Sequence, residues 1–216
     1  MGRIVKCPEE RRQEIVLAAC RLFLAKGYEN TTMRDVMKEL HIAKGTIYHY
    51  FTSKDELLDG VIDHIVDRTL ETQEELAFED EEGALVRIMK FAEFISAKGK
   101  GHIEIVNDLH KPANAGMHIR LAARVVSAQA PFLAGIINRG CEEGVFATST
   151  PLECAEFILS GVQFLTDDGI YPWSREQLER RVTAFPALIE TLLQAPAGSL
   201  SFLTDYISIE HDREDA

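Results

Sequence analysis

The stretch TTMRDVMKELHIAKGTIYHYFTSKDEL, residues 31–57, decides the fold of the first part of the chain. Thr32, with Asp35 three residues later, resembles the capping box that opens a helix, with aspartate in place of the usual glutamate. Residues 41–43 predict a turn, and residues 44–51 predict another short helix. The pattern therefore predicts two short helices joined by a three-residue turn.

Longer helices are expected on both sides of this pair. Residues 8–26 carry apolar residues at spacings of three and four, and Gly27 follows as a residue typical of a helix end. Ser53 and Glu56 form a second capping box, which opens a long helix to about residue 77. This order predicts a three-helix head that contains a helix-turn-helix.

The second short helix has a buried side and an outer side when its residues are placed at 100° intervals. Ile47 and Phe51 fall together and are expected in the head core, joined by Ile42 from the turn. The outer residues are Lys44, Gly45, Thr46, Tyr48 and His49. A helix that enters the major groove of DNA needs outward donors and a small residue where its backbone approaches closely.

Two kinds of DNA contact follow from the side-chain chemistry. Lys44, Tyr48 and Lys54 suit phosphates, which position a protein on the duplex. Thr46 and His49 suit base edges. The helix N-termini at Thr32 and Ser53 also offer backbone N–H groups to phosphates.

Charge is distributed unevenly along the chain. The net charge of −12 argues, taken alone, against nucleic-acid binding. Up to Lys54, however, ten basic and six acidic residues give a net charge of +4, whereas the remainder carries 13 basic and 29 acidic residues. A basic head on an acidic body suits a DNA-binding module joined to a part that avoids DNA, although the excess in the head is slight.

The composition of the 216 residues is that of a globular protein. No apolar run reaches the roughly 18–20 residues of a membrane span, and the N-terminal residues do not form a secretory signal. The four cysteines form no CxxC pair, so reduced thiols in a cytoplasmic protein are expected. We expect no catalytic residues, no cofactor and no bound metal.

Residues 8–60 resemble the DNA-binding region of TetR-family regulators. The similarity is carried by Gly27-Tyr28, by Thr31-Thr32, and above all by KGTIYHYF at 44–51 followed by SKDEL at 53–57. The resemblance implies an all-helical homodimer whose heads bind a palindromic operator and whose bodies bind an inducer. It implies DNA-facing positions for Lys44, Gly45, Thr46, Tyr48 and His49, and phosphate contacts for Thr32 and Lys54. Tyr50 is left open, because the helical wheel turns it towards the core.

The rest of the chain also predicts helices, so the expected fold is all-α. A DNA-binding domain is expected over residues 1–54, a linker helix over about 54–77, and a ligand-binding and dimerisation body over 55–216. Within the body, Gly99-Lys-Gly101 and Pro131 are expected to interrupt helices, and Pro186 to kink the last long one.

A palindrome requires two recognition helices about 34 Å apart, so the body must hold a dimer interface. The last two long helices are the candidates, and burial of the same faces within one chain is the alternative. The expected interface residues are Phe157, Gly161, Leu178, Val182, Phe185 and Ile189.

An effector pocket is expected in the body, where polar residues occur among apolar ones. The candidate residues are Phe91, Phe94, His110, His118, Gln163 and Phe164. His110 and His118 are alternatively a pH-sensitive pair or, with Cys141, metal ligands, but their spacing matches no compact metal motif.

The sequence therefore predicts a one-component transcription regulator, a repressor by resemblance, with operator DNA, a second copy and an unknown small molecule as partners, and no membrane. Two alternatives remain at this point. One is a helix-turn-helix protein that organises DNA without sensing a ligand. The other is an all-helical enzyme without recognisable motifs, although the chain contains no P-loop, nucleophile elbow, GxGxxG or HExxH pattern.

Overall fold

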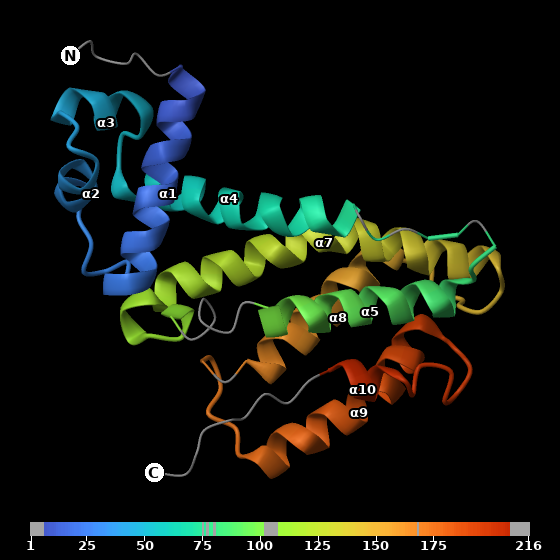
Figure 1. Ribbon diagram of the computed structural model, residues 1–216. Coiled ribbons are helices and arrows are strands. Elements are labelled where there is room, and N and C mark those ends of the chain that lie inside the picture. The colour runs from blue at the N-terminus through green and yellow to red at the C-terminus, as the bar shows by residue number, and fades with distance from the viewer. Residues whose placement is uncertain are drawn as a thin grey trace. The chain divides into compact units, whose positions relative to one another are not determined.

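The computed structural model describes residues 7–74, 76, 78, 79, 81–101, 108–167 and 169–207, and the regular elements of these residues are all helices (Figure 1). They are α1 (Pro8–Lys26), α2 (Met33–Leu40), α3 (Lys44–Tyr50), α4 (Lys54–Glu74), α5 (Ala84–Gly101), the 3-10 helix η1 (Pro112–Asn114), α7 (Ala115–Glu142), α8 (Pro151–Thr166), α9 (Arg175–Leu193) and α10 (Leu203–Tyr206). The predicted all-α fold is confirmed.

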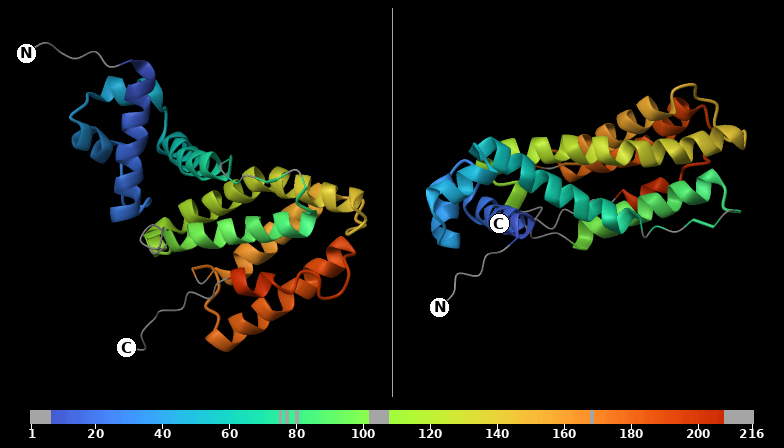
Figure 2. Two further views of the ribbon diagram at one scale, coloured as in Figure 1. Left: turned by 45° about the vertical axis from the view of Figure 1, so that its right-hand side comes forward. Right: turned by 90° about the horizontal axis from the view of Figure 1, so that it is seen from above.

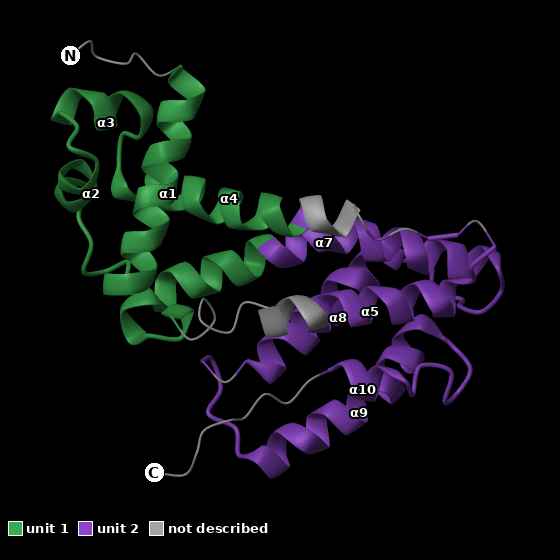
Figure 3. Cartoon of the chain, viewed as in Figure 1, with its two compact units in different colours: residues 1–69, 104–124 green, residues 70–103, 125–216 purple. Residues whose placement is uncertain are grey.

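The chain divides into two compact units (Figure 3). The head unit comprises Met1–Thr69 and Glu104–Arg124, and the body unit comprises Leu70–Ile103 and Val125–Ala216. The predicted DNA-binding domain, residues 1–54, is part of the head unit. The head unit extends beyond these residues, because it also contains most of α4 and the start of α7.

The head unit folds around apolar residues of α1 to α4. Phe23, Val36, Ile47 and Phe51 are all at most 1% exposed, and Leu57 of α4 joins them at 0%. Gly27 ends α1 with a φ of +91°, as its position after the helix predicts. A Cβ atom added to Gly27 would lie 2.4 Å from Cβ of Ala113, so η1 packs against this turn only because residue 27 has no side chain.

The body unit has its own core, built from α5, the second half of α7, α8, α9 and α10. Its buried members include Phe91, Ile137, Phe146 and Leu193. The carboxylate of Glu190, which is 7% exposed, accepts the N–H groups of Gly198 and Leu200 at 2.9 and 2.8 Å. These bonds attach the segment after α9 to the helix and satisfy a charge that would otherwise be costly to bury.

Helix α7 is one continuous ribbon from Ala115 to Glu142 in both views of Figure 2. The predicted interruption at Pro131 is therefore wrong, because the loss of one amide donor does not end a helix whose neighbouring residues pack on both sides of it. Residues Pro112–Glu142 are long and apolar enough to pass a test for a membrane span, but half of the most apolar window is buried inside the protein. This burial is typical of the core helix of a soluble protein.

Other predicted boundaries are partly corrected. Helix α5 ends at Gly101, within the segment 99–101 that was expected to break it. Pro151 begins α8 as expected, but its N-cap Thr150 makes no side-chain capping bond. Ser174 caps α9 as predicted, and α9 continues through Pro186 to Leu193. The end of the linker helix at residue 77 lies outside the described residues.

Candidate DNA-binding surface

The helix-turn-helix begins at a capping box that the sequence predicts. Thr32 Oγ1 accepts the N–H of Asp35 at 3.3 Å, and Asp35 Oδ2 accepts the N–H of Thr32 at 2.9 Å. His41 ends α2 in the left-handed conformation, with a φ of +52°. This turn directs the chain into α3 within three residues.

Helix α3 has one buried side and one open side. Ile47 and Phe51 are 0% exposed, as predicted, and Ile42 from the turn is half-buried. Lys44, Gly45 and His49 are exposed, Tyr48 is 40% exposed, and Thr46 is half-buried. A Cβ atom added to Gly45 would have no neighbour within 4 Å. The outer side of α3 is therefore open enough for another molecule to approach its backbone.

Two lysines at this surface lie over aromatic rings. Lys44 Nζ is 5.5 Å from the ring centroid of Tyr48, and Lys54 Nζ is 4.1 Å from that of Tyr28. Lys54 Nζ also donates to the carbonyl of Glu29 at 3.4 Å. These contacts hold both ammonium groups in place without neutralising them, since neither ring carries a negative charge.

Carboxylates already occupy part of the two predicted phosphate sites at helix N-termini. Asp35 binds the backbone of Thr32, and Glu56 Oε2 accepts the N–H and the hydroxyl of Thr52, both at 2.6 Å. The second box thus differs from its prediction: Ser53 Oγ accepts the N–H of Glu56, but the Glu56 carboxylate binds the residue before Ser53.

These hydrogen bonds lower the pKa of both carboxyl groups, with the threonine hydroxyl as the largest cause in each case. A carboxyl group whose pKa is lowered by folding stabilises the protein above its ordinary pKa, and this stabilisation is lost as the pH falls through the lowered value. Phosphates that approach either helix N-terminus meet an ionised carboxylate there at neutral pH.

A network of polar contacts between Tyr28, α4 and α7, which the sequence did not predict, supports this surface. The hydroxyl of Tyr28 donates to Asp55 Oδ1 at 3.0 Å, and Arg120 of α7 donates to the same oxygen at 3.1 Å. Burial of the ring is the largest cause that raises the pKa of Tyr28 to about 12, followed by the hydrogen bond to Asp55, so the hydroxyl remains a donor. Arg120 also pairs with Asp59.

A further pair, Arg124 with Asp63 at 3.1 Å, continues this row of ion pairs between α4 and α7. The acidic residues of α4 at positions 55, 59 and 63 and the arginines of α7 share a spacing of four. The spacing of four indicates that each set of charges lies on one face of its helix. It does not identify the helix with which that face forms ion pairs.

Within the head unit, Asn114 of η1 links this short helix to the segment between α1 and α2. Its side chain is 0% exposed, its Oδ1 accepts the N–H of Tyr28 at 2.6 Å, and its Nδ2 donates to the carbonyl of Asp108 at 2.8 Å. Beside it, the carbonyl of Ala113 accepts the N–H of Glu29 at 3.0 Å. Residues 28 and 29 directly precede the helix-turn-helix, so η1 fixes the position where it begins.

We expect Asn114→Ala to lower the free energy of unfolding of the head unit by about 1–3 kcal/mol, because two partly buried backbone groups lose their partner. Urea unfolding followed by circular dichroism measures this change. The control is Asn30→Ala, since Asn30 is exposed and its side chain only donates to the carbonyl of Lys26. Equal stability of the two variants would contradict the role given to Asn114.

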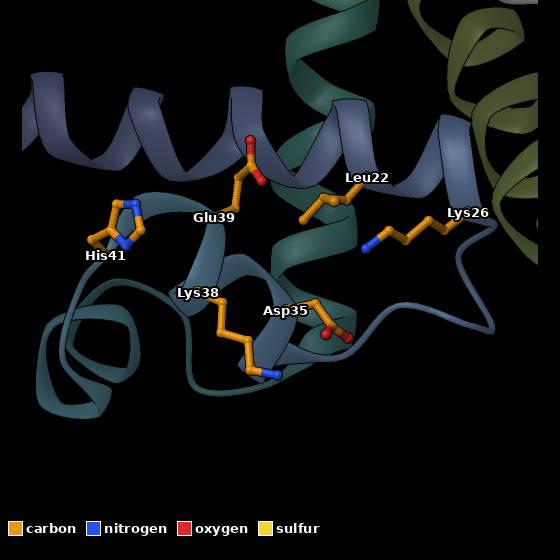
Figure 4. Close-up of a pocket in the computed structure, with 6 residues that line it drawn as sticks. All are labelled: Leu22, Lys26, Asp35, Lys38, Glu39 and His41. Carbon is orange, nitrogen blue, oxygen red and sulfur yellow. The ribbon is translucent and has the colours of Figure 1, made fainter.

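An open pocket of about 350 Å³ lies between α1 and α2 (Figure 4). Its lining residues are Leu22, Lys26, Asp35, Lys38, Glu39 and His41. Two lysines and two carboxylates balance one another, so the pocket selects neither anions nor cations. It contains none of the residues predicted for the effector.

Comparison with known proteins identifies the family. A model of "Bacterial regulatory proteins, tetR family" matches residues 15–61, and a model of "Tetracyclin repressor-like, C-terminal domain" matches residues 100–188. The chain belongs to the TetR family. The first match covers the helix-turn-helix. The second lies in the body, which was predicted from the pattern of helices alone.

Curated relatives match over less than a third of this chain. The regulator HbdR of Aromatoleum sp. (strain CIB) is 39% identical over 62 residues, which are 29% of this chain and 27% of HbdR. The repressor KstR2 of Mycolicibacterium smegmatis is 33% identical over 60 residues, 28% of this chain and 29% of KstR2. The aligned region thus spans less than a third of each relative. The family and these relatives are transcriptional regulators rather than enzymes, which removes the enzyme alternative.

Solved TetR-family structures share the fold over most of the chain. A regulator from Syntrophomonas wolfei str. Goettingen has a TM-score of 0.62 and 19% identity, and covers 89% of this chain and 99% of its own. A regulator from Pectobacterium atrosepticum has a TM-score of 0.59 and 21% identity, and covers 88% of this chain and 100% of its own. At these identities the likeness concerns the fold alone.

The residues that were predicted to form the dimer interface differ in their burial. Val182, Phe185 and Ile189 of α9 are 4–8% exposed and lie in the core of the body unit, and Leu178 is 4% exposed, so these side chains are buried within the chain. Their spacing of three and four is used within the chain. Gly161 is half-buried on α8, and Phe157 is 72% exposed.

The residues predicted to form the effector pocket belong to both units. Phe91 is 5% exposed and lies 5.6 Å from the ring of Phe132, as part of the body core. The others in the body unit, Phe94, Gln163 and Phe164, are half-buried. In the head unit, His110 is half-buried and His118 is 9% exposed, with ring centroids 4.9 Å apart.

Proposed function

We propose that this TetR-family protein is a cytoplasmic homodimeric repressor that binds a palindromic operator and is released by a small-molecule effector. The observation that carries the proposal is the outer side of α3, where Lys44 and His49 are exposed and a Cβ atom added to Gly45 would meet no neighbour within 4 Å. A buried side formed by Ile47 and Phe51 anchors the same helix. The repressor assignment is supported by relatives such as KstR2, which is named a repressor.

Within the proposed complex, α3 enters the major groove and His49 contacts base edges. Lys44, Tyr48 and Lys54 contact phosphates on either side. Lys54 suits this role because its ammonium group lies over the Tyr28 ring and is thereby oriented. The carboxylates of Asp35 and Glu56 accept backbone N–H groups at the starts of α2 and α4. Their negative charge directs phosphates away from these two helix N-termini and towards the lysines.

DNase footprinting of the region upstream of the gene tests this function. We expect protection of a short palindrome with two half-sites one or more helical turns apart. A diffuse footprint would favour a DNA-organising protein instead. No footprint on any fragment of the native genome would refute operator binding.

His49 and Lys54 are expected to contribute in different ways. His49→Ala should reduce affinity for the operator about tenfold while leaving affinity for unrelated DNA unchanged, because a base contact discriminates by about 1–3 kcal/mol. Lys54→Ala should weaken binding to both DNAs and reduce the slope of log K against log salt by about one unit. Lys54→Arg is the matched control, because it keeps the charge. Fluorescence anisotropy at several salt concentrations measures both effects, and equal losses on both DNAs for both alanine variants would contradict this division.

A dimer interface is proposed on exposed faces of α8 and α9. The two most exposed large apolar side chains among the described residues are Phe157 (72%) on α8 and Leu188 (62%) on α9. Such exposure on a globular protein marks an interaction surface when the residues lie on neighbouring elements, and α8 contacts α9. This proposal replaces the buried α9 residues with exposed ones.

We expect Phe157→Asp and Leu188→Asp each to weaken dimerisation about 30-fold or more, since a central apolar contact of an interface contributes about 2 kcal/mol or more. Sedimentation equilibrium measures the monomer–dimer constant. Ile119→Asp is the matched control, because Ile119 is 52% exposed but lies on α7. If both Phe157→Asp and Leu188→Asp dimerised as tightly as the control, the interface would have to lie elsewhere.

The effector is proposed to bind in the body unit, where Phe94, Gln163 and Phe164 combine apolar surface with one amide. A ligand lowers operator affinity only if it binds the DNA-incompetent conformation more tightly. Screening small molecules for release of the protein from its footprinted operator tests this part. An effector that unfolds the head, observed by circular dichroism, would contradict the mechanism.

A further inference from the structure

We propose that His110 and His118 form a binding site for a divalent transition metal ion of the zinc class, and that the bound ion strengthens the support of the DNA-binding head. Their ring centroids are 4.9 Å apart and the planes are tilted by 42°. One ring nitrogen of each residue lies within 4.8 Å of the other. The two residues are eight positions apart in the sequence, so only the fold brings them together.

The geometry suits a metal ion between the rings. Zinc binds imidazole nitrogen at about 2.0–2.1 Å, so two nitrogens on one tetrahedral ion are separated by about 3.4 Å. The proposed site requires the two rings to move closer by a small rotation of their side chains. Two protein ligands leave the other positions of a tetrahedral zinc ion to water or to an oxygen or nitrogen of a small molecule.

The two histidines are also held more firmly than a surface pair. His118 is 9% exposed and lies within the first turns of α7, and His110 is half-buried just before η1. A ligand on a helix and in a partly buried position loses little side-chain freedom when a metal binds.

The site closes a loop that contains the residues supporting the head. Between His110 and His118 lie Ala113, which accepts the N–H of Glu29, and Asn114, which accepts the N–H of Tyr28. An ion that connects the ends of this loop restricts its motion and therefore stabilises the position of the segment before α2. Zinc is thus expected to increase operator affinity, an inference that rests on the proposed DNA-binding function.

Isothermal titration of the full chain with Zn²⁺, in the absence of DNA, tests the site itself. We expect one ion per chain and at least tenfold weaker binding in His110→Ala and in His118→Ala. His64→Ala is the matched control, because His64 lies in the head unit on α4, with Gln13 as its hydrogen-bond partner. At about 100 times its dissociation constant, Zn²⁺ should raise the melting temperature by about 5–10 °C, and this rise should be lost in both variants. Circular dichroism without metal verifies that each variant is folded.

Absence of Zn²⁺ binding in the wild type, or unchanged binding in both folded variants, would overturn the site. Operator affinity with Zn²⁺ and with a chelator tests the coupling, and we expect at least a fivefold increase with metal that both variants lose. Zinc binding without this increase would overturn the support of the head. Failure of operator binding altogether is a different result, because the calorimetric titration contains no DNA.

Discussion

Phe51→Ala is expected to destabilise the protein by about 3–5 kcal/mol, because removal of a fully buried aromatic ring leaves a cavity in the head core. The Phe51 ring is 0% exposed, and a Cβ atom added to Gly60 of α4 would lie 3.0 Å from its Cε1 atom. The ring therefore fills the space that Gly60 leaves open. The guanidinium of Arg12, on α1, lies 5.1 Å from the centroid of the Phe51 ring. The ring at the end of α3 therefore contacts residues of both α1 and α4.

A loss of this size is a large share of the 5–15 kcal/mol that stabilises a typical domain. Thermal unfolding followed by circular dichroism should show a fall of about 6–20 °C in the melting temperature. Tyr48→Ala is the matched control, because Tyr48 is an aromatic residue of the preceding helix with 40% of its surface exposed. If Phe51→Ala were as stable as Tyr48→Ala, the ring would not be part of the head core.

Gly45→Leu is expected to separate folding from DNA binding. A Cβ atom added at position 45 meets no atom within 4 Å and residue 45 is exposed, so the substitution is expected to leave the free protein folded, and the loss of a helical glycine stabilises α3 by a few tenths to about 1 kcal/mol. In the proposed complex, the same side chain occupies the space between the α3 backbone and the bases. Operator affinity should therefore fall at least tenfold, and Gly45→Ala should give a smaller loss.

Thermal unfolding and fluorescence anisotropy on the operator measure the two effects separately. Gly135→Leu is the control, because Gly135 is also exposed on a helix with nothing within 4 Å of an added Cβ atom, but it lies in the body unit. Operator binding by Gly45→Leu at the level of the control would show that DNA does not approach this part of α3.

The features of the head that sequence reasoning predicted depend on local interactions. The box between Thr32 and Asp35 joins residues three apart, and the burial of Ile47 and Phe51 follows from the period of one helix. The contacts of Tyr28 with Asn114 and Asp55 join residues 86 and 27 positions apart, which no local pattern specifies. The identity of the partner depends on which segments pack together.

The body shows the same limit in its apolar residues. Val182 and Ile189 were assigned to a partner because they share one face of α9, but that face packs within the body core. A spacing of three and four predicts that a face is buried without specifying whether the covering surface belongs to the same chain or to another. Pro131 illustrates a related limit, because α7 continues where local preference predicts an interruption.

The exposed apolar side chains of α8 and α9 have a consequence for how the gene under control responds to the amount of repressor. If only a dimer covers both half-sites, then at concentrations below the dimer dissociation constant the amount of DNA-competent protein rises with the square of the chain concentration. A twofold change in expression then produces about a fourfold change in the concentration of the binding species. In the proposed dimer, Phe157 and Leu188 would therefore set, together with the DNA-reading helix, how sharply the cell switches between the repressed and the expressed state.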